Sequence, residues 1–314
     1  MSIKIGTRGS PLALAQAYEA RDLLVAEYPD LEVEIVPITT TGDKVQDRPL
    51  SEVGGKGVFT KELDDALLGG RIDIAAHSMK DVPTWLPEGI VLACMFERED
   101  VRDVLVSPKF TDFGEMPAGS VIGTTSLRRQ SQILAKYPNL KVVIFRGNVQ
   151  TRLRKLSEGQ AEATLLALAG LNRLDRTDVI ARILEPEELL PAVGQGAIGI
   201  ACRAGDEELT SMLGTLDHAP TSLCVAAERA MLDVLDGSCR TPIAGLAELS
   251  NNGQSITIKG LVAEADGSEI WQAERTGPVA SADDLAREIG VELRAAAGEA
   301  FFAKLISHNE LKSK

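Results

Sequence analysis

The stretch Ile72-Asp73-Ile74-Ala75-Ala76-His77-Ser78-Met79-Lys80-Asp81-Val82-Pro83 decides the fold of this chain. It predicts a short buried strand over 72–76, which gives way to polar side chains at His77 and ends at Pro83. In an open parallel sheet, ligands bind just outside the carboxyl ends of the strands. Asp81 is therefore a candidate active-site acid. The alternative is that Asp81 only caps a turn, and this stretch alone does not decide between the two.

The composition is that of a globular protein. With 314 residues, 44% of them hydrophobic, the chain is expected to form two or three domains. It begins directly in a strand-like segment, 1–5, and contains no run of the roughly 20 apolar residues that a membrane span needs. A cytoplasmic protein without a membrane segment is therefore expected. The cysteines and histidines are few and widely spaced, which argues against a disulfide scaffold and against a metal site.

The charge is distributed unevenly. The net charge is −13, but the segment 116–157 contains no Asp or Glu. Its cations are Arg128, Arg129, Lys136, Lys141, Arg146, Arg152, Arg154 and Lys155. A basic segment in an acidic protein predicts a bound anion, although for any one arginine a solvated surface position is the more common explanation. Nucleic acid is a remote alternative, because only Tyr137 and Phe145 are available for base stacking and the overall acidity repels phosphates.

A strand–turn–helix pattern occurs in both halves of the first two thirds of the chain. Strands are expected at 2–5, 31–37, 120–123, 141–145 and 164–169, and helices at 10–28, 60–68, 127–137 and 151–158. This alternation predicts two similar α/β domains with parallel sheets.

Arginines accompany the predicted turns. A helix N-terminus presents backbone N–H groups that suit carboxylate or phosphate. Five arginines lie at or beside such turns, namely Arg8, Arg128, Arg129, Arg146 and Arg152. Their forked guanidinium groups favour a ligand with several carboxylates.

The loop 39–56 ends in Gly54-Gly55-Lys56-Gly57, which superficially resembles a phosphate-binding loop. It lacks the Lys-Ser/Thr ending and the preceding strand of such a loop, so nucleotide binding is not expected there. A loop of this length is more typical of a mobile lid.

The last third has a different pattern. After a predicted crossing between domains at 191–196, a helix is expected at 223–235, then strands at 243–249, 256–263 and 269–274. Asn252-Gly253 and Asp266-Gly267 are strong hairpin signals between these strands. A closing helix is expected over 281–306. The pattern predicts a small α+β domain with an antiparallel sheet.

Cys239 lies in a predicted loop, Asp236-Gly237-Ser238-Cys239-Arg240-Thr241-Pro242. Arg240 beside it favours the thiolate form. The other cysteines, Cys94, Cys202 and Cys224, are expected in apolar packing, and a structural thiol is also the more common explanation for Cys239 itself. No histidine is near enough in sequence to activate Cys239, so a thiol that forms one lasting bond suits this position better than a protease-like nucleophile.

Six motifs give the chain a resemblance to the porphobilinogen deaminase family, also called hydroxymethylbilane synthases, over nearly its whole length. They are Thr7-Arg8-Gly9-Ser10-Pro11-Leu12-Ala13, Val53-Gly54-Gly55-Lys56-Gly57, His77-Ser78-Met79-Lys80-Asp81-Val82-Pro83, Gly123-Thr124-Thr125-Ser126-Leu127-Arg128-Arg129-Gln130, Arg146-Gly147-Asn148-Val149-Gln150-Thr151-Arg152 and Pro191-Ala192-Val193-Gly194-Gln195-Gly196.

The resemblance implies three domains: 1–98 with 197–215, then 99–196, both built like periplasmic binding proteins, and 216–314. It implies a transferase that adds four porphobilinogen molecules to a dipyrromethane cofactor and releases ammonia and a linear tetrapyrrole for haem biosynthesis. Cys239 would carry this cofactor through a thioether. A monomer is expected, with porphobilinogen as its small-molecule partner.

The resemblance also implies the site. A buried Asp81 would donate a proton to the departing amine and stabilise the cation that forms. Lys56 and Phe59 would belong to the lid. The cleft residues would be Arg8, Ser10, Ser78, Lys80, Thr124, Ser126, Arg128, Arg129, Arg146, Arg152, Arg173 and Gln195.

Two positions depart from the family pattern. Ser238 replaces a glycine before the anchoring cysteine, which predicts a stiffer loop. Val101 stands where many members have proline, which predicts a looser hinge between domains.

The alternative function is a non-catalytic, two-lobed binding protein for a polycarboxylate ligand. Such a protein would normally need a secretion signal and would have no use for a loop cysteine.

Overall fold

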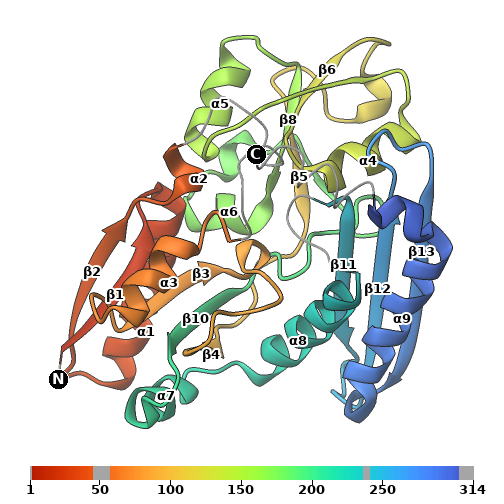
Figure 1. Cartoon of the computed structure of the whole chain (residues 1–314). Coiled ribbons are helices and arrows are strands. Elements are labelled where there is room, and N and C mark those ends of the chain that lie inside the picture. Colours follow the sequence, from red (N-terminus) through yellow and green to blue (C-terminus); the bar gives the residue numbers. More distant parts are fainter. Residues whose placement is uncertain (1, 45–56, 236–240, 304–314) are drawn as a thin grey trace.

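A computed structural model describes residues 2–44, 57–235 and 241–303 of the chain. The described residues form three sheets, each covered by helices (Figure 1). Two of the sheets are five-stranded and belong to two α/β lobes, and the third is a three-stranded antiparallel sheet. The predicted fold class, two α/β lobes followed by a small α+β domain, is confirmed. No helix among the described residues has the length and apolar character needed to cross a membrane.

The first lobe has the strand order β2-β1-β3-β10-β4. Its strands are β1 (Ser2–Arg8), β2 (Glu32–Ile38), β3 (Ile74–Ser78), β4 (Ile90–Met95) and β10 (Ile198–Arg203). The helices of this lobe are α1 (Pro11–Glu27), the short α2 (Thr41–Lys44), α3 (Lys61–Leu68) and α7 (Glu207–Gly214). Ser10 caps α1 by accepting a hydrogen bond from the Ala13 backbone N–H, and Pro11 occupies the first turn.

The second lobe has the order β7-β6-β8-β5-β9. Its strands are β5 (Asp103–Val106), β6 (Val121–Gly123), β7 (Lys141–Val143), β8 (Ala163–Ala167) and β9 (Arg182–Leu184). The helices are α4 (Leu127–Lys136), α5 (Val149–Ser157) and α6 (Leu168–Arg173). The strand predicted over 164–169 therefore ends at Ala167, and its last two residues begin α6.

The prediction of parallel sheets is wrong in one respect, because both sheets are mixed. β1, β2 and β3 are parallel, as are β6, β7 and β8, but β10 runs antiparallel to β3 and β5 runs antiparallel to β8. The chain crosses between the lobes at 96–102 and returns at 190–197, and we call these the crossing segments. β5 and β10 begin directly after these crossings. They run away from the edge at which the parallel strands end, so their direction is reversed.

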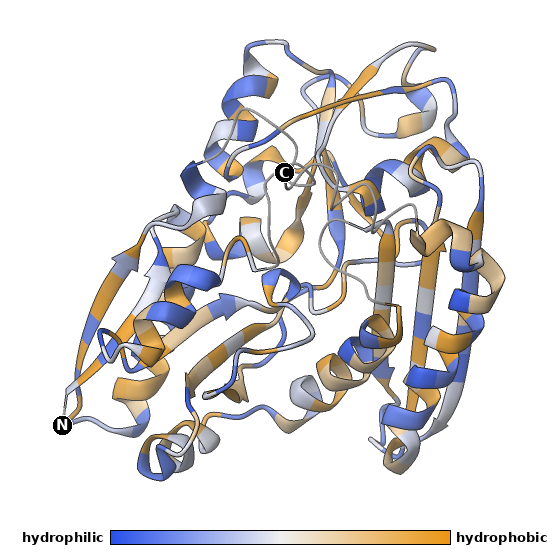
Figure 2. Ribbon diagram, viewed as in Figure 1, coloured by the Kyte–Doolittle hydropathy of each residue, from blue (hydrophilic) through white to orange (hydrophobic). Residues whose placement is uncertain are grey.

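The third sheet consists of β11 (Ile243–Leu249), β12 (Ser255–Ala263) and β13 (Ile270–Pro278). The helices α8 (Ala219–Val234) and α9 (Ala282–Ala297) cover one face, where Met231, Ile258 and Ile289 are fully buried. Figure 2 shows β11 and β12 as largely apolar. The other face packs on Leu190 of the second crossing segment, with Val101 of the first beside it. The third sheet therefore lies against the junction of the two lobes.

α9 is shorter than the sequence predicted. It ends at Ala297, and Gly298 follows with φ +79° before helical residues resume at Glu299. A positive φ is readily adopted by glycine and interrupts the helix.

One buried carboxylate joins three parts of the molecule. Glu228 of α8 is 0% exposed and accepts hydrogen bonds from Arg98 Nη1 and Nη2 at 2.6 and 3.1 Å. It also accepts from the backbone N–H groups of Gly194, at 2.7 Å, and Ala247, at 2.9 Å. Glu228 therefore connects both crossing segments to β11.

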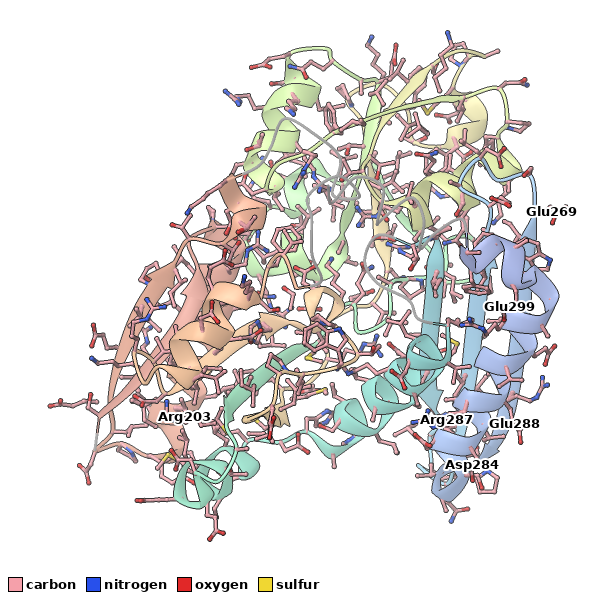
Figure 3. The ribbon with its side chains drawn as sticks, in the orientation of Figure 1. Arg203, Glu269, Asp284, Arg287, Glu288 and Glu299 are labelled. Atoms are coloured by element: carbon pink, nitrogen blue, oxygen red, sulfur yellow. The ribbon has the colours of Figure 1, made fainter. Side chains whose placement is uncertain are left out.

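We expect Glu228→Gln to lower the free energy of unfolding by about 3 kcal/mol, because it leaves the largely buried Arg98 guanidinium without a counter-charge. Urea unfolding followed by circular dichroism measures this. The matched control is Glu288→Gln on α9, whose side chain is 63% exposed and lies at the edge of the molecule in Figure 3. Equal stabilities of the two variants would contradict the assigned importance of the Arg98–Glu228 pair.

Candidate functional site

A cavity of about 550 Å³ lies where the two lobes and the third sheet meet. The carboxyl ends of parallel strands border it: Arg8 ends β1, Asp81 follows β3, and the turn before α4 follows β6. Leu232, Thr241 and Ile243 line it from the third part of the chain. The sequence-predicted residues that line it are Arg8, Ser10, Phe59, Lys80, Asp81, Ser126, Arg128, Arg129, Arg146, Arg152 and Gln195.

Three predicted residues do not line this cavity. Ser78 Oγ exchanges hydrogen bonds with the side-chain amide of Gln16, at 2.8 and 3.0 Å. Thr124 Oγ1 accepts from the Ser126 backbone N–H at 3.1 Å and so shapes the turn before α4. Arg173 of α6 reaches across to α1, where its Nε donates to Glu19 at 2.8 Å. These side chains support the cavity wall or the contact between the lobes.

Several predictions lie outside the described residues. They are the positions of Lys56, Ser238 and Cys239, and the lid prediction for residues 45–56 of the loop 39–56. Within that loop, α2 is an ordered helical turn whose Gly42 lies against the Phe59 ring.

Asp81 sits in a 3-10 turn, Met79–Asp81, directly after β3. Its side chain lines the cavity and is 29% exposed, so Asp81 is partly exposed where a buried carboxylate was expected. Arg8 Nη1 lies 3.6 Å from Asp81 Oδ2. This arrangement leaves the carboxyl group accessible to a ligand while holding a cation beside it.

Arg8 has a second acidic partner, Asp43 of α2, which the sequence did not reveal. Arg8 Nε donates to Asp43 Oδ2 at 3.2 Å, and its guanidinium carbon lies 4.1 Å from the centre of the Phe59 ring. Burial alone would raise the pKa of Asp43, but the hydrogen bonds and charge of Arg8 lower it below its ordinary value. Asp43 and the Phe59 ring therefore both hold the Arg8 guanidinium group beside Asp81.

Arg128 and Arg129 share a buried counter-ion. Both side chains are almost fully buried, and both approach Asp103 at the start of β5, at 2.8 and 2.7 Å. The sequence analysis did not identify Asp103. It considered only the basic segment 116–157, and Asp103 precedes that segment in the chain. The signal available was an aspartate heading an apolar strand, Asp103–Val106.

The remaining cations crowd the same cavity. Lys80 Nζ lies 3.5 Å from Gln195 Oε1, and burial, followed by the charge of Arg129, lowers the pKa of Lys80 to about 8. Burial and the charges of Arg129 and Arg146 likewise lower the pKa of Arg152 to about 10. Crowded, desolvated cations of this kind favour an incoming anion strongly.

His77 and the three described cysteines are buried away from the cavity and are therefore poor candidates for a base or a nucleophile. Burial lowers the pKa of His77 to about 4, so its ring is neutral at physiological pH, and it does not line the cavity. Cys94, Cys202 and Cys224 are buried, as predicted, and burial raises the pKa of Cys94 to about 12 and of Cys224 to about 11. No cluster of three or more potential metal ligands occurs among the residues that the structure describes.

Comparisons with known proteins agree over almost the whole chain. Residues 3–211 match the family model "Porphobilinogen deaminase, dipyromethane cofactor binding domain", and residues 222–295 match "Porphobilinogen deaminase, C-terminal domain". The chain is 57% identical over 310 residues to the chloroplastic porphobilinogen deaminase of Oryza sativa subsp. japonica, covering 96% of this chain and 86% of the relative. It is 53% identical over 303 residues to that of Paracoccus denitrificans, covering 96% of each.

Among solved structures, the chain has a weak similarity to the periplasmic VFT2 domain of Bordetella pertussis BvgS. That domain has a TM-score of 0.42 and 18% identity, and the match covers 68% of this chain and 86% of that one.

Proposed function

The chain belongs to the porphobilinogen deaminase family, and from this premise we propose which of its residues carry the reaction. The enzyme is a transferase that joins four porphobilinogen molecules head to tail on a dipyrromethane primer. It releases ammonia and the linear tetrapyrrole hydroxymethylbilane, a precursor of haem. Family membership favours this function over the alternative of a non-catalytic binding protein.

The observation that carries the residue assignment is the meeting of one accessible acid, Asp81, with a group of cations in one cavity. Each pyrrole of the substrate and of the growing chain bears an acetate and a propionate group. The chain therefore gains negative charge with every unit. Arginine forks bind carboxylates through paired, charge-assisted hydrogen bonds. We assign this binding to Arg8, Arg128, Arg129, Arg146 and Arg152, with Lys80, Ser10, Ser126 and Gln195 completing the site.

Asp81 is assigned two tasks. In its protonated form the carboxyl group donates a proton to the amine that leaves porphobilinogen. The resulting carboxylate then stabilises the cationic methylene-pyrrole that this loss creates. Arg8, 3.6 Å away and itself fixed by Asp43, orients the carboxylate during both steps.

The residues around the cavity fit a dipyrromethane cofactor. Arg129 lines the cavity, and its Nε is a buried donor without an acceptor among the described residues, so the protein itself leaves one donor of this arginine unsatisfied. When bound, the cofactor supplies two pyrrole rings and the free carbon to which the next ring is joined. Thr241, two positions after Cys239, lines the same cavity, which supports attachment through the Cys239 thiol.

The remaining assignments are proposals of the same kind. We propose domain boundaries at 1–98 with 197–215, 99–196 and 216–314, a division that the strand membership of the three sheets supports. Phe59 and Lys56 are assigned to a lid over the cavity. Ser78, Thr124 and Arg173 are assigned supporting roles, since other side chains and the backbone occupy their polar atoms. A cytoplasmic monomer, as expected from the sequence, is part of the same proposal.

Intact-mass spectrometry of the purified protein tests the cofactor assignment. We expect a mass above that of the sequence by two linked pyrrole units, and we expect Cys239→Ala to have the bare sequence mass and no turnover. Cys224→Ala is the control and should keep the added mass, because that thiol is buried in packing. A fully active enzyme with the bare sequence mass would refute the assignment.

A further inference from the structure

Asp103 lies next to the cavity without lining it. It is the first residue of β5, inside the second lobe's sheet, and its side chain is 0% exposed. Asp103 Oδ1 accepts from Arg129 Nη2 at 2.7 Å and from Gln195 Nε2 at 3.1 Å. Asp103 Oδ2 lies 2.8 Å from Arg128 Nη2, an ion-pair distance without the angle of an aligned hydrogen bond. Three cavity-lining residues therefore meet at one hidden carboxylate.

The backbone holds the same arginines from other directions. Arg128 Nη1 donates to the Leu190 carbonyl at 2.8 Å, and Arg129 Nη1 donates to the Leu165 carbonyl at 2.9 Å. With Asp103, these contacts leave Arg129 Nε as a buried donor without a described acceptor. These contacts hold both guanidinium groups in place at the wall of the cavity.

Positive charges outnumber negative charges around Asp103. One carboxylate faces Arg128 and Arg129, with Lys80 nearby. Burial alone would raise the pKa of Asp103, but the charges of Arg128 and Arg129 outweigh burial and lower it far below its ordinary value. Asp103 is therefore ionised. Without it, closely spaced cations would repel one another in a region of low dielectric constant.

We propose that Asp103 is a positioning residue for the reaction, which fixes Arg128 and Arg129 for carboxylate binding and, together with Gln195, keeps the Lys80 ammonium in the cavity. The inference rests on the proposed use of this cavity to hold the polycarboxylate chain. Asp103 acts through its neighbours and does not touch the substrate. No motif named in the sequence includes it.

The pKa of Lys80 depends on the charge of Asp103 and can therefore be used to test this role. The charged groups that act on it are Arg129, Arg128, Asp81 and Asp103, the arginines lowering its pKa and the acids raising it. Its pKa of about 8 means that Lys80 loses its charge as the pH rises through 8. Removal of the Asp103 charge lowers this pKa further, so the loss of the charge begins at a lower pH.

The test compares three variants of the full chain. Asp103→Asn removes the charge, Asp103→Glu keeps the charge but moves it by one methylene, and Asp100→Asn is the control. Asp100 is a nearby carboxylate paired with Arg102, and it does not line the cavity. The pKa of Lys80 is measured by competitive acetylation across a pH series with peptide mass spectrometry. The fraction of protein that carries the cofactor is measured by intact mass.

For Asp103→Asn, we expect the pKa of Lys80 to fall by about one unit or more and cofactor loading to fall about tenfold. For Asp103→Glu, we expect the pKa of Lys80 to stay near 8, because a carboxylate remains at this position. We expect cofactor loading to fall, because the longer side chain displaces the guanidinium groups of Arg128 and Arg129. Asp100→Asn should change neither quantity. If Asp103→Asn does not fold, Asp103→Glu decides alone, and full loading in that variant overturns the proposal.

An unchanged pKa of Lys80 together with normal loading in Asp103→Asn would also overturn it. The Lys80 measurement does not depend on turnover. A wild-type protein without the cofactor mass would refute the proposed attachment. A loaded wild type, combined with an unchanged Lys80 pKa and normal loading in Asp103→Asn, would refute only the role of Asp103.

Discussion

Asp81→Asn is expected to lower turnover by roughly 10³-fold or more, because the amide can neither donate the proton to the leaving amine nor stabilise the cation with a full charge. The side chain keeps its shape, and its partial exposure makes the change tolerable for folding. Cofactor attachment should remain possible. The measurement is the rate of product formation from porphobilinogen, with intact mass recorded on the same sample.

The matched control is Asp65→Asn, which makes the same chemical change at an exposed position of α3. Asp81→Glu distinguishes the need for a carboxyl group from the need for its exact position. This variant keeps a carboxyl group but moves it by one methylene, so it should retain more activity than Asp81→Asn. Turnover of Asp81→Asn at the wild-type rate would remove Asp81 from the mechanism.

Arg129→Leu is the second large expected effect. It removes a buried guanidinium group that contacts Asp103 and the Leu165 carbonyl, together with its unsatisfied Nε donor. Loss of paired, charge-assisted contacts to a carboxylate should reduce cofactor loading and turnover on the order of 100-fold. Intact mass measures the loading, and native gels resolve the complexes with successive numbers of pyrrole units.

The same variant makes a prediction of opposite sign at Lys80. Because the charge of Arg129 lowers the pKa of Lys80, its removal should raise that pKa above 8, whereas Asp103→Asn should lower it. Arg154→Leu is the control, since Arg154 belongs to the same acid-free stretch but its side chain is 68% exposed. Equal loading in the two arginine variants would show that the basic stretch acts through its total charge and not through Arg129.

These two variants act on opposite sides of one cavity. Asp81 comes from the first lobe and Arg129 from the second, and Gln195 of the second crossing segment lies between Lys80 and Asp103. The chemical step and the binding of carboxylates therefore depend on how the lobes are held together. Glu228 and Arg98 contribute to that arrangement from outside the cavity, which is why their loss should affect stability first.

The sequence alone determined the local elements. Alternating and helical periodicities located most strands and helices, Ser10 and Ser126 marked helix starts that the structure caps through their hydroxyl groups, and hairpin signals located the antiparallel sheet. These features depend on contacts between residues a few positions apart, so the linear pattern carries them. The position of Asp81 after a buried strand is of the same kind.

Only the tertiary structure decided the direction of β5 and β10 and the pairing of the buried charges. Asp103 meets Arg128 and Gln195, and Glu228 meets Arg98, across long separations in the chain. Arg173 was predicted in the cleft but pairs with Glu19 on α1. Such partners depend on which strands become neighbours and on where the chain crosses between the lobes. The order of residue types along the chain does not predict these partners, because a buried ion pair forms between groups that only folding brings together.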